Sequence, residues 1–112
     1  MIVKRSTDIA ASAVDIEGAE AVRIRWLIGP DTQAPHFYLR QFEVDPGGHT
    51  PYHSHPFEHE VFILEGKGRI NTAGGEIPLE KDMFAFVAGN EAHQFENTGK
   101  SVLKFLCIVP RE

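Results

Sequence analysis

Imidazole side chains are concentrated in the stretch PGGHTPYHSHPFEHEVFILEG, residues 46–66, which contains four of the six histidines of the chain. His53 and His55 are two positions apart, so on one strand both imidazoles would project from the same face. His59 has the same odd-number parity at the start of the next apolar run, and His93 follows a turn far downstream. Neutral imidazoles are ligands for divalent transition metals. The spacing therefore predicts a metal site formed by His53, His55, His59 and His93.

Two segments around these histidines resemble the sequence motifs of the cupin superfamily. Gly47, the His53-Ser54-His55 triplet, His59 and Gly66 have the spacing of the first motif. Residues 82–97, DMFAFVAGNEAHQFEN, resemble the second motif. The resemblance is closest to small single-domain cupins that hold a manganese-type metal on four histidines.

The resemblance implies a fold, a domain organisation and a cofactor. We expect an all-β protein with a small antiparallel β-barrel of the cupin type, that is, a double-stranded β-helix or jelly roll. Residues 1–112 are expected to form a single cupin domain, in which residues 1–20 pack on the barrel or on a partner subunit. The implied cofactor is one divalent metal per chain, with Mn favoured, followed by Fe, Ni, Cu and Zn.

Glu60 is the alternative to His59, because common cupins place a glutamate as third protein ligand. However, Glu60 leaves five residues before Gly66 where the motif has six, and strand alternation turns it to the face opposite His59. We therefore expect His59 to be the ligand. His49 and His36 match no ligand position of the motif, and both are expected to be non-ligands.

The second segment departs from the cupin motif at two turns. Asp82 stands where glycine is usual, and Ala88-Gly89-Asn90 replaces the usual Pro-x-Gly turn. Asparagine tolerates the left-handed backbone conformation nearly as well as glycine does. We therefore expect the turn to survive and His93 to keep its place.

Short strands separated by turns account for most of the chain. No segment keeps a helical period, and residues 6–20 hold the only candidate for a helical turn. This spacing predicts an antiparallel sandwich or small barrel, in which up-and-down pairing brings the four histidines onto one inner face. The expected strands are AVRIRWLIG (21–29), HFYLRQFEV (36–44), EVFILEG (60–66), GRINT (68–72), EIPL (76–79), MFAFV (83–87), HQFENT (93–98) and VLKFLCIVP (102–110).

Several of these strands are apolar on both faces. In the last strand Lys104 should face water, which places residues 103, 105, 107 and 109 on the inner face, yet Leu106 and Ile108 share the side of Lys104. A single small barrel has only one interior. The outer apolar face therefore predicts a second layer, either a partner subunit in a homodimer or the N-terminal segment folded back.

Candidate pocket residues follow from the same alternation. Phe105 and Cys107 share the inner face of the last strand, where Phe105 could equally be simple core and Cys107 a small apolar residue. Arg40 could point inward toward an anion or lie on the outer face at an interface. Asn97 has the parity of His93 and is expected either to support the ligands from behind or to hold a turn. No catalytic acid or base is evident.

Composition excludes several classes of partner. The formal net charge of −5 argues against a nucleic-acid or anionic-membrane partner, which would require a basic patch. With one cysteine the chain can form no intrachain disulfide, and no apolar run approaches membrane-spanning length. The N-terminus lacks the apolar region of a signal peptide, so the cytoplasm is the expected location.

An all-imidazole site favours a small anionic or enolisable ligand, because four neutral ligands leave the charge of the metal uncompensated. An octahedral ion would keep two adjacent positions open, whereas tetrahedral zinc would be closed. The resemblance favours a metal-dependent oxidoreductase, a dioxygenase-like enzyme for a small carbonyl, enol or aromatic compound. The alternatives are a non-catalytic binding or sensing module and a metal-dependent lyase or isomerase.

Overall fold

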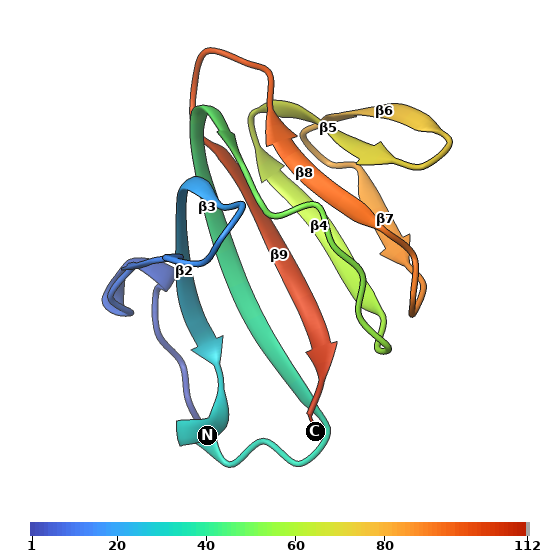
Figure 1. Cartoon of the computed structure of the whole chain (residues 1–112). Coiled ribbons are helices and arrows are strands. Elements are labelled where there is room, and N and C mark those ends of the chain that lie inside the picture. The colour runs from blue at the N-terminus through green and yellow to red at the C-terminus, as the bar shows by residue number, and fades with distance from the viewer. Residues whose placement is uncertain (112) are drawn as a thin grey trace.

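The computed structural model describes residues 1–111, which form a curled antiparallel sheet with the shape of a half-open barrel (Figure 1). Two short 3-10 turns, η1 (Ser6–Asp8) and η2 (Pro30–Thr32), are the helical elements of this part of the chain. The strands are β1 (Ser12–Ala13), β2 (Glu20–Ile28), β3 (Phe37–His49), β4 (His59–Glu65), β5 (Lys67–Thr72), β6 (Gly75–Glu80), β7 (Phe84–Val87), β8 (His93–Asn97) and β9 (Leu103–Pro110). The predicted all-β fold class is confirmed.

The strands lie where the apolar runs and turn residues predict them. Each expected run from β2 to β9 is a strand, and η1 is the helical turn expected within residues 6–20. The principal difference is β3, which continues through the Pro46-Gly47-Gly48 segment to His49. Gly48 makes this continuation possible, because a Cβ there would lie 2.6 Å from the carbonyl oxygen of Glu20 on the adjacent strand.

The predicted up-and-down pairing is wrong. The strand order is β6-β5-β8-β3-β9-β4-β7, with β2 paired to the other side of β3, so consecutive strands are often separated in the sheet. β4 pairs with β9 and β7, while β8 pairs with β5 and touches the end of β3 through the His49 and Glu96 positions. The turn residues correctly predict where the strands lie, but they do not specify which distant strands pair.

The core lies on the concave face of the sheet. Leu103, Phe105, Cys107 and Val109 of β9 are all buried, which confirms the inner face predicted from alternation in that strand. Phe105 stacks on two further inner-face rings, with centroid distances of 5.3 Å to Phe42 of β3 and 4.8 Å to Phe95 of β8. These rings line the interior of the curled sheet.

The outer face of the strands β9, β4 and β7 is apolar and exposed. Phe84 and Phe86 of β7 are 78% and 66% exposed. Phe62 of β4 is in register with Phe84, and Glu60 of β4 is in register between Phe86 and Ile108 of β9. The N-terminal segment does not cover this face, because β1 pairs with β2 on the other side of the sheet. No helix of residues 1–111 is long and apolar enough to cross a membrane.

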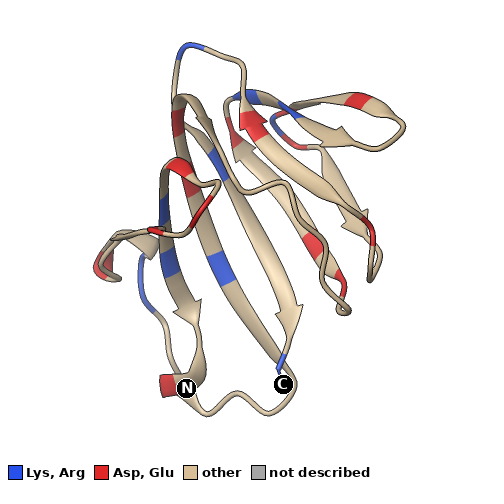
Figure 2. Cartoon of the chain, viewed as in Figure 1, with Lys and Arg blue, Asp and Glu red and all other residues tan. Residues whose placement is uncertain are grey.

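The outer face of β2 and β3 is polar instead. Figure 2 shows basic residues on β2 beside acidic residues on β3. Glu43 is buried there and accepts a hydrogen bond of 2.8 Å from Arg25 Nε, while Arg23 pairs with Asp45 at 2.8 Å. Burial alone would raise the pKa of Glu43, but the bonds from Arg25 and Gln41 lower it below its ordinary value.

Candidate metal centre and its cavity

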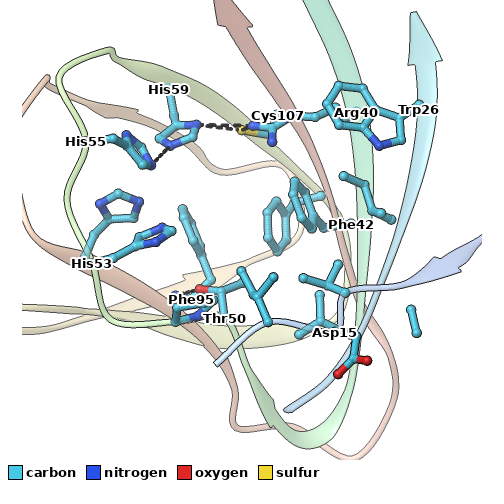
Figure 3. Close-up of a pocket in the computed structure, with 18 of the residues that line it drawn as sticks. Asp15, Trp26, Arg40, Phe42, Thr50, His53, His55, His59, Phe95 and Cys107 are labelled. Atoms are coloured by element: carbon cyan, nitrogen blue, oxygen red, sulfur yellow. Dashed lines mark hydrogen bonds between the residues drawn. The ribbon is translucent and has the colours of Figure 1, made fainter. Parts of the chain in front are cut away.

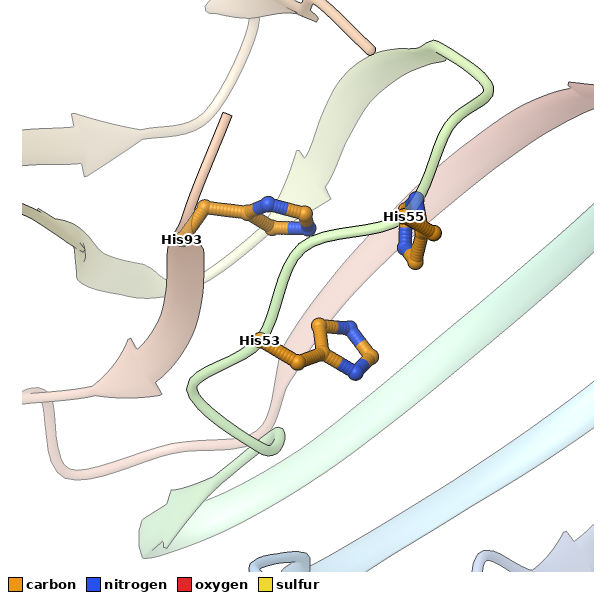
Figure 4. A group of neighbouring side chains, drawn as sticks. All are labelled: His53, His55 and His93. Carbon is orange, nitrogen blue, oxygen red and sulfur yellow. The ribbon is translucent and has the colours of Figure 1, made fainter. Parts of the chain in front are cut away.

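Three of the predicted ligand histidines converge at the mouth of the half-barrel (Figure 4). The donor atoms of His53, His55 and His93 all lie within 4.8 Å of one another. His53 and His55 lie on the connection that leads to β4, and His93 is the first residue of β8. The residues that the structure brings together are therefore far apart in the sequence and come from two separate segments.

A backbone bridge holds these two segments in register. His53 and His93 exchange reciprocal backbone hydrogen bonds of 3.1 and 3.0 Å, which form an isolated antiparallel bridge. The turn before β8 packs onto the same connection, since the Asn90 N–H donates to the His55 carbonyl oxygen at 2.6 Å. Asn90 has φ of 65°, so the left-handed conformation predicted for this turn is confirmed. Asp82, which replaces the usual glycine, has φ of 73° and is left-handed too.

Hydrogen bonds to backbone carbonyls select the tautomer of two of the histidines. His55 Nδ1 lies 3.2 Å from the carbonyl oxygen of Phe57, and His93 Nδ1 lies 2.8 Å from that of Glu91. Because a carbonyl oxygen only accepts, each Nδ1 carries the proton and each Nε2 keeps its lone pair. This is the arrangement that metal-binding histidines require.

His59 lies beside the set of three and is buried on β4. Its Nε2 is 2.7 Å from Nε2 of His55, and its Nδ1 is 3.1 Å from Sγ of Cys107 (Figure 3). Glu60, the alternative ligand, is exposed on the opposite face of the strand, where it lies in register with Phe86. Alternation along β4 therefore directs the imidazole toward the cluster and the carboxylate away from it.

Burial favours the neutral form of three of these imidazoles. Burial, followed by the neighbouring His55 and the guanidinium of Arg40, lowers the pKa of His59 to about 3. Burial lowers the pKa of His93, and burial together with His55 and His93 lowers the pKa of His53. Neutral imidazoles whose ring nitrogens converge are a donor set that fits a divalent transition metal.

The histidines occupy one end of a cavity of about 410 Å³ (Figure 3). Phe42, Phe57, Phe95 and Phe105 contribute aromatic walls, and Trp26 contributes a further ring from β2. The N-terminal segment supplies residues 13–16 to the lining. The cavity thus combines a cluster of nitrogen donors with a mostly apolar interior.

Arg40 and Cys107 lie together in the wall next to His59. Arg40 Nη2 donates to Cys107 Sγ at 3.0 Å and lies 3.4 Å from His59 Nδ1. The pKa of the Cys107 thiol is raised by burial, against the opposing charge of Arg40. The guanidinium itself is covered by aromatic rings, with its carbon 5.1 Å from the Phe42 centroid and 5.6 Å from that of Trp26. Of the two positions considered for Arg40, the structure shows the inward one.

The remaining sequence candidates lie in different environments. Phe105 is both buried core and cavity floor. Asn97 is a turn residue, since its amide donates to the carbonyls of Val44 and Ser101 and accepts from the Gly99 N–H, each at 2.8 Å, and it contacts none of the histidines. His49 Nδ1 lies 3.2 Å from its neighbouring carbonyl, outside the cluster.

Sequence reasoning missed two contributors to the cavity. Trp26 carries no motif, and its place in the wall depends on the pairing of β2 with β3, which puts it in register with Arg40. Residues 13–16 reach the cavity only because β1 pairs with the far side of β2. Their one signal in the sequence was the spacing of Val14 and Ile16, two apolar residues on either side of Asp15.

Carboxylates are scarce around the cluster. Glu58, Glu60 and Glu91 are all exposed and do not line the cavity, and Glu91 instead accepts from the Ala88 N–H at 3.1 Å. Asp15 is the one acidic residue of the lining, and Figure 3 shows it across the cavity from His59. The arrangement supplies nitrogen donors, aromatic surface and one cation, with no carboxylate next to the histidines.

Known proteins resemble this chain in sequence and in structure. The oxalate-binding protein of Thermotoga maritima is 32% identical over 81 residues, which cover 69% of this chain and 67% of that protein. The tetracenomycin polyketide synthase protein TcmJ of Streptomyces glaucescens is 30% identical over 99 residues, which cover 87% of this chain and 66% of TcmJ. The polyketide cyclase RemF of Streptomyces resistomycificus superposes with a TM-score of 0.94 at 32% identity, over 100% of this chain and 80% of RemF.

A family model confirms the grouping that the histidine motifs indicate. The model described as "Cupin domain" matches residues 40–109, which include both histidine segments and most strands of the curled sheet. The match covers more than half of the chain, and the chain is therefore a member of the cupin family.

Proposed function

We propose that the protein is a metal-dependent enzyme that binds an aromatic, enolisable carbonyl compound and closes a ring in it. The observation that carries the proposal is the cluster of neutral imidazoles at one end of a mostly apolar cavity of about 410 Å³. The similarities to the polyketide cyclase RemF and to the polyketide synthase protein TcmJ support the same chemistry. Oxalate alone would leave most of the aromatic wall of this cavity unfilled.

The proposed metal ligands are His53, His55, His59 and His93. Neutral imidazole nitrogens are ligands of divalent transition metals. Manganese is the favoured ion, with Fe, Ni, Cu and Zn as the next candidates.

The protein and the metal would have separate tasks in the reaction. A bound divalent metal supplies Lewis acidity toward a carbonyl or enolate oxygen. The chain holds the imidazoles neutral by burial and presents Phe42, Phe95 and Trp26 to a flat substrate. The apolar wall excludes water, which strengthens every electrostatic contact inside the cavity.

Dioxygenation, the activity that the sequence resemblance favours, is the second candidate. The all-imidazole donor set favours it, because nitrogen ligands suit the redox-active metals Mn and Fe. A binding or sensing module would share the site but release its ligand unchanged. A lyase or isomerase that needs a carboxylate beside the metal is less well supported, since Glu58, Glu60 and Glu91 lie outside the cavity.

We also propose that the chain forms a homodimer through the outer face of β4, β7 and β9. Phe62 and Phe84 are exposed there in register with each other, and Phe86 and Ile108 are exposed on the same face with Glu60 in register between them. Clusters of exposed aromatic side chains of this kind mark association surfaces in soluble proteins.

The experiment that tests the function separates the reaction classes by product mass. Protein purified without a metal-affinity column is analysed for metal, loaded with Mn or Zn, and incubated with aromatic poly-β-ketones under argon and under isotopically labelled oxygen. Loss of water from the substrate under argon identifies cyclisation with dehydration. Uptake of labelled oxygen identifies dioxygenation, and unchanged substrates with every metal would overturn the enzyme proposal.

A further inference from the structure

Arg40 is a cation without an anionic partner in the cavity wall. The ion pairs formed among residues 1–111 involve Arg23, Arg25, Arg69 and Lys104, and none of them includes Arg40. Its Nε is buried and has no hydrogen-bond partner. A buried guanidinium nitrogen without a partner costs free energy, so a protein that retains one leaves a donor for a ligand to satisfy.

The orientation of the guanidinium is fixed by its neighbours. Trp26 and Phe42 cover it at 5.6 and 5.1 Å from its carbon, and the Nη2 contact to Cys107 Sγ at 3.0 Å fixes one corner. The contacts made through Nη2 leave the other nitrogens of the group for a ligand within the cavity. Planar donor groups held in this way favour carboxylates and other oxyanions with two acceptor atoms.

Arg40 is also close to the proposed metal site. Its Nη2 is 3.4 Å from Nδ1 of His59. The other ring nitrogen of His59, Nε2, faces His55. Asp15, the one acidic residue of the lining, lies across the cavity and forms no ion pair with Arg40. The positive charge of Arg40 is thus left for the ligand to neutralise.

We infer that Arg40 selects the substrate of this cavity: an aromatic compound with two oxygen functions on one edge, one of them an anion held by the guanidinium. The second oxygen is the carbonyl or enol function directed at the histidine cluster. The aromatic body would lie against Phe42, Phe95 and Phe105, which the structure places beneath both anchors. This inference deepens the proposed function and rests on it only for the role of the second oxygen.

The test is a titration of the full-length protein with 1-hydroxy-2-naphthoate, followed by calorimetry, in metal-free and Mn-loaded forms. The control ligand is 1-naphthol, which has the same rings without the carboxylate. Arg40→Gln should weaken binding of the naphthoate at least about tenfold, the loss expected for a charge-assisted hydrogen bond, and leave binding of 1-naphthol unchanged. Arg111→Gln, which removes an exposed arginine outside the cavity, should bind both ligands as the wild type does.

Two further measurements distinguish a loss of ligand binding from a loss of folding. Arg40→Lys retains the charge without the planar fork, and it should bind the naphthoate more tightly than Arg40→Gln and more weakly than the wild type. The Tm of Arg40→Gln should equal or exceed that of the wild type, because the substitution removes a buried donor that has no partner.

The inference is overturned if the wild type fails to bind the naphthoate, or if Arg40→Gln binds it as tightly as the wild type does. It is also overturned if Arg111→Gln loses as much affinity as Arg40→Gln. If the metal-free protein binds the naphthoate through Arg40 but no metal-loaded form turns over a substrate, the proposed function alone is overturned. Turnover of a carboxylate-bearing ketone with equal kcat/KM by the wild type and Arg40→Gln would overturn this inference alone.

Discussion

The Nε2 atoms of His55 and His59 face each other across 2.7 Å, with His55 on the connection before β4 and His59 at the first residue of β4. His55 Nδ1 donates to the Phe57 carbonyl, so Nε2 of His55 has a lone pair. Two lone pairs cannot remain in contact at this distance, so His59 Nε2 carries a proton that it shares with His55. A metal ion that binds both nitrogens would replace this proton, which moves to Nδ1 of His59 beside Cys107 Sγ.

Replacement of His59 by alanine should therefore remove or greatly loosen the metal. Removal of a residue that only hydrogen-bonds to a metal ligand lowers metal affinity roughly 10–100-fold. Removal of the ligand itself should lower it by more than that. Metal content per chain after dialysis against a weak chelator, measured by elemental analysis, checks this. Glu60→Ala and His49→Ala are the matched controls, and both should retain metal because their side chains lie away from the cluster. Full occupancy in His59→Ala would refute the assignment.

Gly89 sets the distance between the two segments that carry the histidines. A Cβ at Gly89 would lie 2.5 Å from the Pro56 carbonyl oxygen, which belongs to the connection that holds His53 and His55. Gly89→Ala must push the turn before β8 away from that connection, because a carbonyl oxygen of the backbone cannot rotate aside. We expect a loss of about 1–3 kcal/mol in the free energy of unfolding, together with weaker metal binding.

Gly74→Ala provides the control for the glycine substitution. A Cβ at Gly74 would approach only Thr72 Oγ1, at 3.9 Å, so nothing has to move. The two variants are compared by urea denaturation and by metal titration of the metal-free proteins. If Gly89→Ala matches Gly74→Ala in both measurements, the packing of the turn against Pro56 does not position the ligands.

The sequence predicts most of the strands and the ligand candidates because both depend on local patterns. His53 and His55 share a face through their spacing alone, and the alternation in β9 correctly separates Phe105 and Cys107 from Ile108. Asn90 is identifiable as left-handed from its residue type, as the φ of 65° confirms.

The strand order and the cavity could not be predicted in the same way. The pairing of β8 with the connection before β4 depends on contacts between residues about forty positions apart, such as the bridge of His53 to His93. Trp26 reaches the cavity only through the register of β2 against β3, and local residue preferences do not specify register between distant strands. The sequence does not specify whether Arg40 points inward or outward, for the same reason.

Glu43 should make the stability of the protein depend on pH in the acid range. Its folded-state pKa lies below the ordinary value of 4.5, since the bonds from Arg25 and Gln41 outweigh the effect of burial. The stabilisation is therefore complete above the unfolded-state pKa and is lost as the pH falls through the folded-state pKa. Glu43→Gln should cost about 1.5–3 kcal/mol at neutral pH, and this difference should shrink as the pH falls below the range of unfolded carboxylates.

Urea denaturation of the wild type and Glu43→Gln over a series of acidic pH values measures this difference directly. Glu65→Gln is the control, because that carboxylate is 62% exposed and lies 3.7 Å from Lys104. An exposed pair of this kind should alter the free energy of unfolding by less than about 1 kcal/mol. A difference between the wild type and Glu43→Gln that stays constant down to the acid transition would contradict the role given to Glu43.

The aromatic outer face of β7 should decide the oligomeric state. Phe84 is 78% exposed and lies in register with Phe62, so a lysine at position 84 places a charge in the centre of the apolar surface. Burial of such a charge at a subunit interface is strongly unfavourable. Sedimentation velocity should show a dimer for the wild type and a monomer for Phe84→Lys. Ile77→Lys, which changes an isoleucine that is 50% exposed on β6, should remain dimeric, whereas a monomeric wild type would remove this face from the assembly.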